Sequence, residues 1–225
     1  MLLRRNRPWN NADDESMVGH VLHARRDRRP LSRPTRRRAM TPDYADTYAG
    51  HLEQLAAQSP AAPALVAPGR RAMSFGALAR HVVATRTALA AWNIGAGDTV
   101  AWPAIDRAAT AGALAILPAC ATMVPLSSSL TASAYERVLV RARCKAVVLP
   151  AGVEHPMREA ARNAGVTELA AFSEPHGEVG TFDLALVHET STLAASASID
   201  RSVTYVSLTS GTTGRPKLVP TNWTA

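Results

Sequence analysis

The stretch YVSLTSGTTGRPKLVP, residues 205–220, determines how the rest of the chain is interpreted. The stretch SVTYVSLTS, residues 202–210, predicts a strand that leads directly into a loop of hydroxyl residues. Gly211 and Gly214 permit positive φ, so successive backbone N–H groups can converge on an anion. Each hydroxyl can donate a hydrogen bond to a phosphate oxygen, and Lys217 adds a mobile positive charge. The composition therefore predicts a polyphosphate-binding loop, called the phosphate loop below, which consists of Thr209, Ser210, Gly211, Thr212, Thr213, Gly214 and Lys217.

This loop is not a Walker A motif, because that motif places four residues between its first glycine and a Gly-Lys-Ser/Thr ending. Here two residues separate Gly211 from Gly214, and Lys217 follows Pro216. The bland alternative is an ordinary Ser/Thr/Gly-rich turn between strands. The ordered combination of hydroxyls, both glycines and a final Pro-Lys favours phosphate binding over that alternative.

Upstream of the loop, strand and helix patterns alternate every 10–20 residues, which is typical of an α/β fold with helices packed on a mostly parallel sheet. A first helix is expected after residue 41, with Thr41 as N-cap and Pro42 at its first position. Residues 64–75 predict two short strands about a Pro-Gly turn. Residues 173–200 show a weaker pattern and include a small, polar surface connection. The expected strands are 98–104, 123–126, 145–150, 166–172 and 202–210, and the expected helices are 76–93 (stopped by Gly95 and Gly97), 108–121, 131–143 (opened by Thr131) and 155–165 (ended by Gly165).

The net charge of +7 lies entirely in the first forty residues, which hold eleven arginines and four acidic residues. Residues 41–225 hold fourteen basic and fourteen acidic residues and are neutral. We expect residues 1–40 to form a disordered Arg-rich tail, with Met40 as the natural start, and residues 41–225 to form the folded domain. The tail lacks the apolar region of a secretory signal. An Arg-tailed nucleic-acid-binding protein is an alternative function, but the tail has one aromatic residue and the body has no basic excess.

The two cysteines, Cys120 and Cys144, lie in apolar stretches and are expected to be buried, inert thiols. This cysteine usage favours a reducing, cytoplasmic location. Residues 108–135 carry no charge, but Pro118 and Pro125 interrupt them, so we expect a buried helix and strand there and no transmembrane segment. The histidines and the isolated aspartates suggest no metal-binding or catalytic cluster, and we assign no catalytic or metal residue.

TSGTTGRPK, led by YVSL, resembles the phosphate-loop signature of the adenylate-forming enzymes. These AMP-dependent synthetases and ligases include the acyl- and aryl-CoA synthetases, the adenylation domains of nonribosomal peptide synthetases and firefly-type luciferases. MSFGALARHV (residues 73–82), GDTVAWPA (97–104) and residues 111–150 with their Val-Pro-Leu strand also resemble this family. The resemblance covers about residues 41–225.

The resemblance implies that the chain is part of the large N-terminal domain of the adenylate-forming fold, incomplete at its C-terminus. It implies that the phosphate loop holds the β- and γ-phosphates of ATP. The implied reaction converts a carboxylate and ATP into an acyl-adenylate and pyrophosphate, with Mg²⁺ balancing charge. A thiol, of coenzyme A or of a carrier phosphopantetheine, would then accept the acyl group, as in the activation step of fatty acid metabolism.

Some residues depart from the family pattern. PACATMVPL lacks a common turn glycine, Asp106-Arg107 replaces small or amide residues, and TNW stands where a hydroxyl residue and His are common. The family's adenine, carboxylate, magnesium and catalytic-lysine segments have no match in this sequence. We therefore expect a truncated N-terminal fragment of an acyl- or aryl-CoA ligase that is inactive alone. The alternatives are an adenylation domain of a nonribosomal peptide synthetase and a non-catalytic relic, and the substrate acid stays open.

Overall fold

The structure, a computed structural model, describes residues 47–174, 176–190, 199–209 and 217–223. The chain divides into two units, Met1–Met40 and Thr41–Ala225. The predicted Arg-rich tail lies outside the described residues, so the description below concerns the second unit alone.

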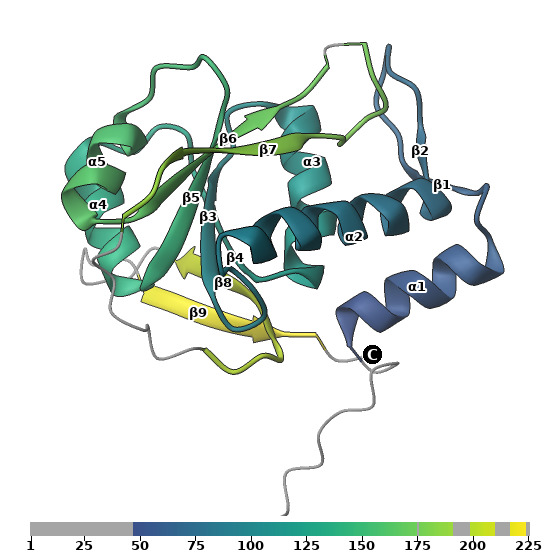
Figure 1. Cartoon of the computed structure of the whole chain (residues 1–225), viewed down its shortest axis with the longest axis horizontal. Helices are drawn as coiled ribbons and strands as arrows, with labels where there is room; N and C mark the ends of the chain where they lie inside the picture. Colours follow the sequence, from purple (N-terminus) through teal and green to yellow (C-terminus); the bar gives the residue numbers. More distant parts are fainter. Residues whose placement is uncertain (1–46, 175, 191–198, 210–216, 224–225) are drawn as a thin grey trace, which may run out of the picture. The chain divides into compact units, whose positions relative to one another are not determined.

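A seven-stranded sheet with the order β7-β6-β5-β3-β4-β8-β9 forms the centre of this unit (Figure 1). Its five inner strands run parallel, whereas the two edge strands, β7 and β9, run antiparallel to their neighbours. The predicted mostly parallel, helix-covered sheet is confirmed. The strands are β3 (Thr99–Pro103), β4 (Thr122–Leu126), β5 (Cys144–Pro150), β6 (Thr167–Phe172), β7 (Asp183–His188), β8 (Val203–Thr209) and β9 (Lys217–Asn222).

Helices cover both faces of the sheet (Figure 1). On one face α1, α2 and α3 enclose a core that includes Leu78, and on the other face α4 and α5 enclose a core that includes Met157. The central strands supply both cores because successive side chains alternate between faces: Val148 belongs to the first core and Val147 to the second. The helices are α1 (Tyr48–Gln58), α2 (Phe75–Ala91), α3 (Arg107–Ile116) with the 3₁₀ turn η2 (Leu117–Ala119), α4 (Ala132–Arg141) and α5 (Pro156–Ala164).

Two predicted helix ends are confirmed. The Thr131 hydroxyl caps α4 by accepting the N–H of Ala134 at 3.3 Å. At the C-terminal end of α5, Gly165 adopts the left-handed conformation with φ 64°, which a Cβ would disfavour.

Three helix ends lie at other residues than predicted, and the first and third predictions are wrong. Helix α1 begins at Tyr48 with Thr47, not Thr41, as its N-cap; Thr41 itself lies outside the described residues. Helix α2 ends at Ala91, two residues before the predicted Asn93, which takes the left-handed conformation with φ 56°. The predicted helix 108–121 ends as an α-helix at Ile116 and continues as the turn η2, since Pro118 cannot donate a helical hydrogen bond.

The edge strands were not predicted. β7 lies in the segment of weak pattern, and β9 contains Pro220, which an edge strand tolerates because one side of its backbone needs no partner. The predicted short hairpin is confirmed as β1 (Pro63–Leu65) and β2 (Met73–Ser74). As predicted, the uncharged segment 108–135 forms α3, η2, the buried β4 and the start of α4. Within the described part of the chain, no helix has the length and apolar character needed to cross a bilayer.

Candidate functional site

The carboxyl ends of the parallel strands meet at one edge of the sheet, which is where open α/β sheets bind ligands. The order in which successive strands are added to the sheet reverses between β3 and β5. β3 connects through α3 to β4 on one side, whereas its other neighbour, β5, connects through α5 to β6 on the opposite side. The phosphate loop leaves this same edge, because it follows the carboxyl end of the parallel strand β8.

The two ends of the phosphate loop are fixed by strand pairing. Thr209 is the last residue of β8, Lys217 is the first residue of β9, and the two lie opposite each other in the ladder. Both are exposed. Cross-strand partners share a face of a sheet, so the Thr209 hydroxyl and the Lys217 ammonium start from the same side of the hairpin. The other predicted members, Ser210, Gly211, Thr212, Thr213 and Gly214, lie outside the described residues.

A second group of hydroxyls follows the neighbouring strand β4. Ser127 and Ser129 place their Oγ atoms 2.9 Å apart in the loop directly after Leu126. Met123 of β4 pairs with Tyr205 of the parallel strand β8; β4 ends three residues later at Leu126 and β8 ends four residues later at Thr209. The serine loop, residues 127–129, therefore extends the hydroxyl-rich edge.

Side chains from the α4–α5 layer hold this serine loop. The Tyr135 hydroxyl donates to the Ser127 carbonyl at 2.5 Å, and burial raises the pKa of Tyr135, so the hydroxyl keeps its proton. The Nε2 of His155 donates to the Ser128 carbonyl at 3.2 Å, while its Nδ1 accepts the N–H of Met157 at 3.3 Å. These two bonds require the neutral ring with its proton on Nε2.

The sequence did not single out this second group. The signal that could have found it is the run of three serines immediately after a buried strand, because the neighbouring parallel strand ends at the same edge. Tyr135 and His155 had no such signal, since their roles depend on contacts between α4, α5 and the loop.

Asp106, three residues after the end of β3, also lies on the carboxyl side of the sheet, but its side chain already has hydrogen-bond partners. Its Oδ1 accepts the N–H groups of Ala108 and Ala109 at 2.8 and 3.0 Å, so it caps α3. This supports its interpretation as a structural residue. An acidic side chain at position 106 thus has a local role as the N-cap of α3.

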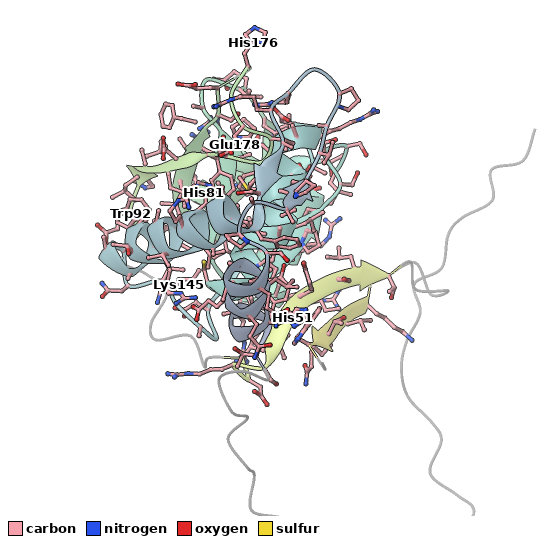
Figure 2. All side chains as sticks on the ribbon, turned by 90° about the vertical axis from the view of Figure 1, so that its right-hand side faces the viewer. His51, His81, Trp92, Lys145, His176 and Glu178 are labelled. Carbon is pink, nitrogen blue, oxygen red and sulfur yellow. The ribbon has the colours of Figure 1, made fainter. Side chains whose placement is uncertain are left out.

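The two lysines lie at opposite ends of the parallel strands. Lys145, labelled in Figure 2, is near the start of β5. Its ammonium pairs with Asp98 at 3.0 Å and also donates to the Asn93 carbonyl. Lys217 is at the carboxyl edge. Lys217 is therefore the lysine available to a phosphate at this edge.

The cysteines are buried as predicted, one under each face of the sheet, and both are free thiols. Burial raises the pKa of Cys120 and of Cys144 to about 12, so neither is a thiolate nucleophile near neutral pH. Among the described residues, no group of three or more histidine, cysteine or acidic side chains could hold a metal ion.

The fold is shared with solved structures of CoA synthetases. The structure of a fatty acyl CoA synthetase from Mycobacterium tuberculosis matches with a TM-score of 0.54 and 19% identity over 80% of this chain and 35% of that chain. The o-succinylbenzoate CoA synthetase MenE from Bacillus subtilis, in complex with the acyl-adenylate OSB-AMP, matches with a TM-score of 0.53 and 19% identity over 76% of this chain and 42% of that one. The N-terminal domain of FACL13 from M. tuberculosis matches with a TM-score of 0.54 and 21% identity over 79% and 44%.

These likenesses show the fold, and this chain spans less than half the length of each of those structures. No curated protein matches the sequence. The sequence does match the family of AMP-binding enzymes over residues 52–223, which is most of the chain and includes the phosphate loop. The chain therefore belongs to the AMP-binding enzyme family.

Proposed function

We propose that this chain holds the triphosphate of ATP in an adenylate-forming ligase, the class of enzyme that activates a carboxylate with ATP. The observation that carries the proposal is the pairing of Thr209 with Lys217 at the carboxyl end of β8, beside the serine loop, in a chain of the AMP-binding family. The β- and γ-phosphates would contact the phosphate loop: Thr209, Ser210, Gly211, Thr212, Thr213, Gly214 and Lys217.

The proposed reaction requires the loop to stabilise negative charge on the leaving group. A carboxylate oxygen attacks the α-phosphorus, the bond from the α-phosphorus to the bridging oxygen breaks, and pyrophosphate leaves with the bonding electrons. Negative charge on pyrophosphate grows during this step. Preorganised hydroxyl, amide and ammonium donors stabilise that charge without solvent reorganisation, which lowers the barrier.

Mg²⁺ would enter as its complex with ATP. The described residues offer no cluster of acidic ligands, and Mg²⁺ in nucleotide sites is commonly held through the substrate phosphates and few protein groups. Its contribution would be to neutralise phosphate charge. The loop residues of this chain would orient the same phosphates.

We infer an acyl or aryl acid as substrate and coenzyme A as acceptor, because the structures of the same fold include a fatty acyl CoA synthetase, an o-succinylbenzoate CoA synthetase and a benzoate CoA ligase. A carrier-bound thiol, as in peptide-synthetase adenylation domains, is the second candidate acceptor. Trapping the activated acid with either thiol distinguishes the two.

We further propose that residues 41–225 form part of an AMP-binding domain and that these 225 residues alone bind nucleotide without turnover. The reason lies in the lysines: the sequence holds two, Lys145 is ion-paired at the opposite edge, and Lys217 belongs to the phosphate loop. Neither is free to act on the carboxylate. ATP–pyrophosphate exchange by the purified chain with a panel of carboxylic acids tests this, and sustained exchange would contradict it.

The binding proposal is tested by calorimetric titration of the 225-residue chain with Mg·ATP and with Mg·pyrophosphate. Lys217→Met should weaken both affinities by about 10- to 100-fold, the usual value of a hydrogen bond to a charged group. The matched control is Lys145→Met, which removes the same charge from the opposite edge and should leave both affinities unchanged. Unchanged affinity in Lys217→Met and in Thr212→Ala/Thr213→Ala overturns the proposal, as does a non-binding wild-type chain.

A further inference from the structure

The last turn of α3 has a carbonyl that the helix itself cannot satisfy. In an α-helix the Leu114 carbonyl would accept from the N–H of residue 118, but that residue is Pro118. Later N–H groups donate to a different carbonyl: those of Cys120 and Ala121 both donate to the Leu117 carbonyl at 2.8 Å. The Leu114 carbonyl therefore needs a donor from outside the helix.

Tyr205 of β8 supplies that donor. Its hydroxyl donates to the Leu114 carbonyl although 91 residues separate the two in sequence. Burial raises the pKa of Tyr205, so the phenol remains protonated and remains a donor at neutral pH. The strand that leads into the phosphate loop is thus tied to the end of α3 through one side chain.

This tie matters because the ladder between β8 and β4 is short. The β3–β4 ladder runs along the whole of β3, whereas β8 joins β4 through a single bridged pair, Met123 with Tyr205. One side-chain bond reinforces it, from the Thr122 hydroxyl to the Val203 carbonyl at 2.8 Å. Tyr205 is therefore both the bridged residue of β8 and the cap of α3.

We propose that Tyr205 is a positioning residue for the phosphate loop. It lies four residues before Thr209, and it fixes where the β8–β9 hairpin sits against α3 and β4. Loss of its hydroxyl frees the β8–β9 ladder to shift, and this displaces Thr209 and Lys217, the paired ends of the phosphate loop, from the position that binds phosphate. This inference rests on the proposed function of the loop.

Tyr48 provides a matched control at the same helix end. Its hydroxyl donates to the adjacent carbonyl, that of Ala115, at 2.9 Å, and burial raises its pKa as well. Tyr48 belongs to α1, however, and not to the hairpin. Its ring contacts Trp223, with ring centroids 5.1 Å apart, and Tyr48→Phe keeps that ring.

The test compares Tyr205→Phe with Tyr48→Phe in the 225-residue chain, well below the unfolding temperature. Without nucleotide, amide hydrogen exchange in β8 and β9 should accelerate about tenfold in Tyr205→Phe and stay at the wild-type rate in Tyr48→Phe. With Mg·ATP, the dissociation constant should rise about tenfold in Tyr205→Phe alone. Both variants should lower the melting temperature similarly, since each loses one hydroxyl hydrogen bond to a carbonyl in the last turn of α3.

Each other outcome counts against the inference. Equal exchange in both variants, or unchanged exchange in Tyr205→Phe, shows that this hydroxyl does not hold the hairpin. Faster exchange with an unchanged dissociation constant shows that it does not position the loop. A wild-type chain without affinity for Mg·ATP overturns the proposed function and the positioning role together, while the exchange comparison still decides whether Tyr205 anchors the hairpin.

Discussion

Glu168 is a carboxylate in the middle of the fold, with 4% of its side chain exposed, and it is paired there with Arg158 of α5. Arg158 also donates its Nε to the Val153 carbonyl at 3.0 Å, so the guanidinium holds both the strand and the turn before α5. Burial removes the Glu168 carboxylate from water, and the ion pair with Arg158 compensates for the lost hydration. The cost of breaking this pair should therefore exceed that of an exposed one.

The first prediction follows from this pair. Arg158→Ala should lower the free energy of unfolding by about 3–5 kcal/mol, because it leaves a buried carboxylate without its partner. Lys145→Ala breaks the more exposed pair with Asp98 and should cost about 1 kcal/mol or less. Urea unfolding followed by circular dichroism measures both values, and equal costs would contradict this assignment.

The second prediction concerns His81, whose Nε2 accepts the N–H of Phe182 at 3.2 Å. Burial lowers the pKa of His81 below its ordinary 6.5, although Asp183 and Glu178 act in the opposite direction. Below pH 6.5 the unfolded chain binds a proton that the folded chain binds less readily. The stabilising contribution is therefore complete above pH 6.5 and is lost as the pH falls toward the lower folded-state pKa.

The free energy of unfolding, measured between pH 7.5 and 5.0, should show this loss in the wild-type chain. His81→Gln keeps an acceptor for the Phe182 N–H but does not titrate, so its profile should be flatter over the same range. Identical profiles for the two proteins would rule out His81 as the source of the slope.

At the scale of elements, α3 approaches the loop before β7 at a point where neither can carry a side chain. A Cβ added to Gly112 would lie 2.0 Å from the carbonyl oxygen of Gly180, which itself has φ 81°. This contact fixes how closely α3 lies against the residues that lead into β7. A glycine in the middle of a helix, unfavourable by propensity, thus has a packing reason.

The third prediction is that Gly112→Ala destabilises the fold by about 1–3 kcal/mol, despite the better helix propensity of alanine, because the backbone must move apart. Gly95→Ala is the matched substitution, since nothing lies within 4 Å of its added Cβ and its backbone has no positive φ. Thermal unfolding compares the two. A stabilised Gly112→Ala protein would contradict the close approach.

Elements with local signals were predictable, and elements defined by distant contacts were not. The inner strands are continuous apolar runs such as KAVVLP, and Thr131 and Gly165 mark helix ends by their own chemistry. The edge strand β7 was not predicted because most of its residues are at least partly exposed and its apolar and polar residues alternate weakly. The edge strand β9 was not predicted because it contains Pro220 and polar residues.

The candidate site divides in the same way. The phosphate loop could be predicted because its hydroxyls, glycines and lysine are contiguous in sequence. The serine loop joins it only through the pairing of β4 with β8. The Tyr205 tie to Leu114 spans 91 residues, and no local pattern encodes it.

For the molecule as a whole, the two cores are joined through the sheet they share. Neighbouring residues of β5 face opposite ways, with Val148 in the core under α1–α3 and Leu149 in the core under α4 and α5. Loss of either helix layer would expose one face of strands whose opposite face the other layer still covers. The second unit should therefore unfold in one cooperative transition.

The fourth prediction tests this cooperativity with a variant in one core and probes in the other. The tryptophans among the described residues, Trp92, Trp102 and Trp223, pack on the α1–α3 side of the sheet or against α1, so fluorescence from that part of the chain reports that side. Met157→Ala removes a fully buried side chain under α4 and α5 and should cost about 2–5 kcal/mol. Fluorescence and far-ultraviolet circular dichroism should give the same shifted urea midpoint, because loss of the second core also removes support from the first.

The reciprocal variant, Leu89→Ala, removes a fully buried side chain from the core under α1–α3. It should shift both midpoints together as Met157→Ala does, since the sheet transmits the loss in either direction. If fluorescence instead kept its wild-type midpoint in Met157→Ala while circular dichroism shifted, the α4–α5 layer would unfold separately. The serine loop that Tyr135 and His155 hold would then lose its structure before the rest of the carboxyl edge. Phosphate binding would disappear at a lower urea concentration than the midpoint of the tryptophan fluorescence transition.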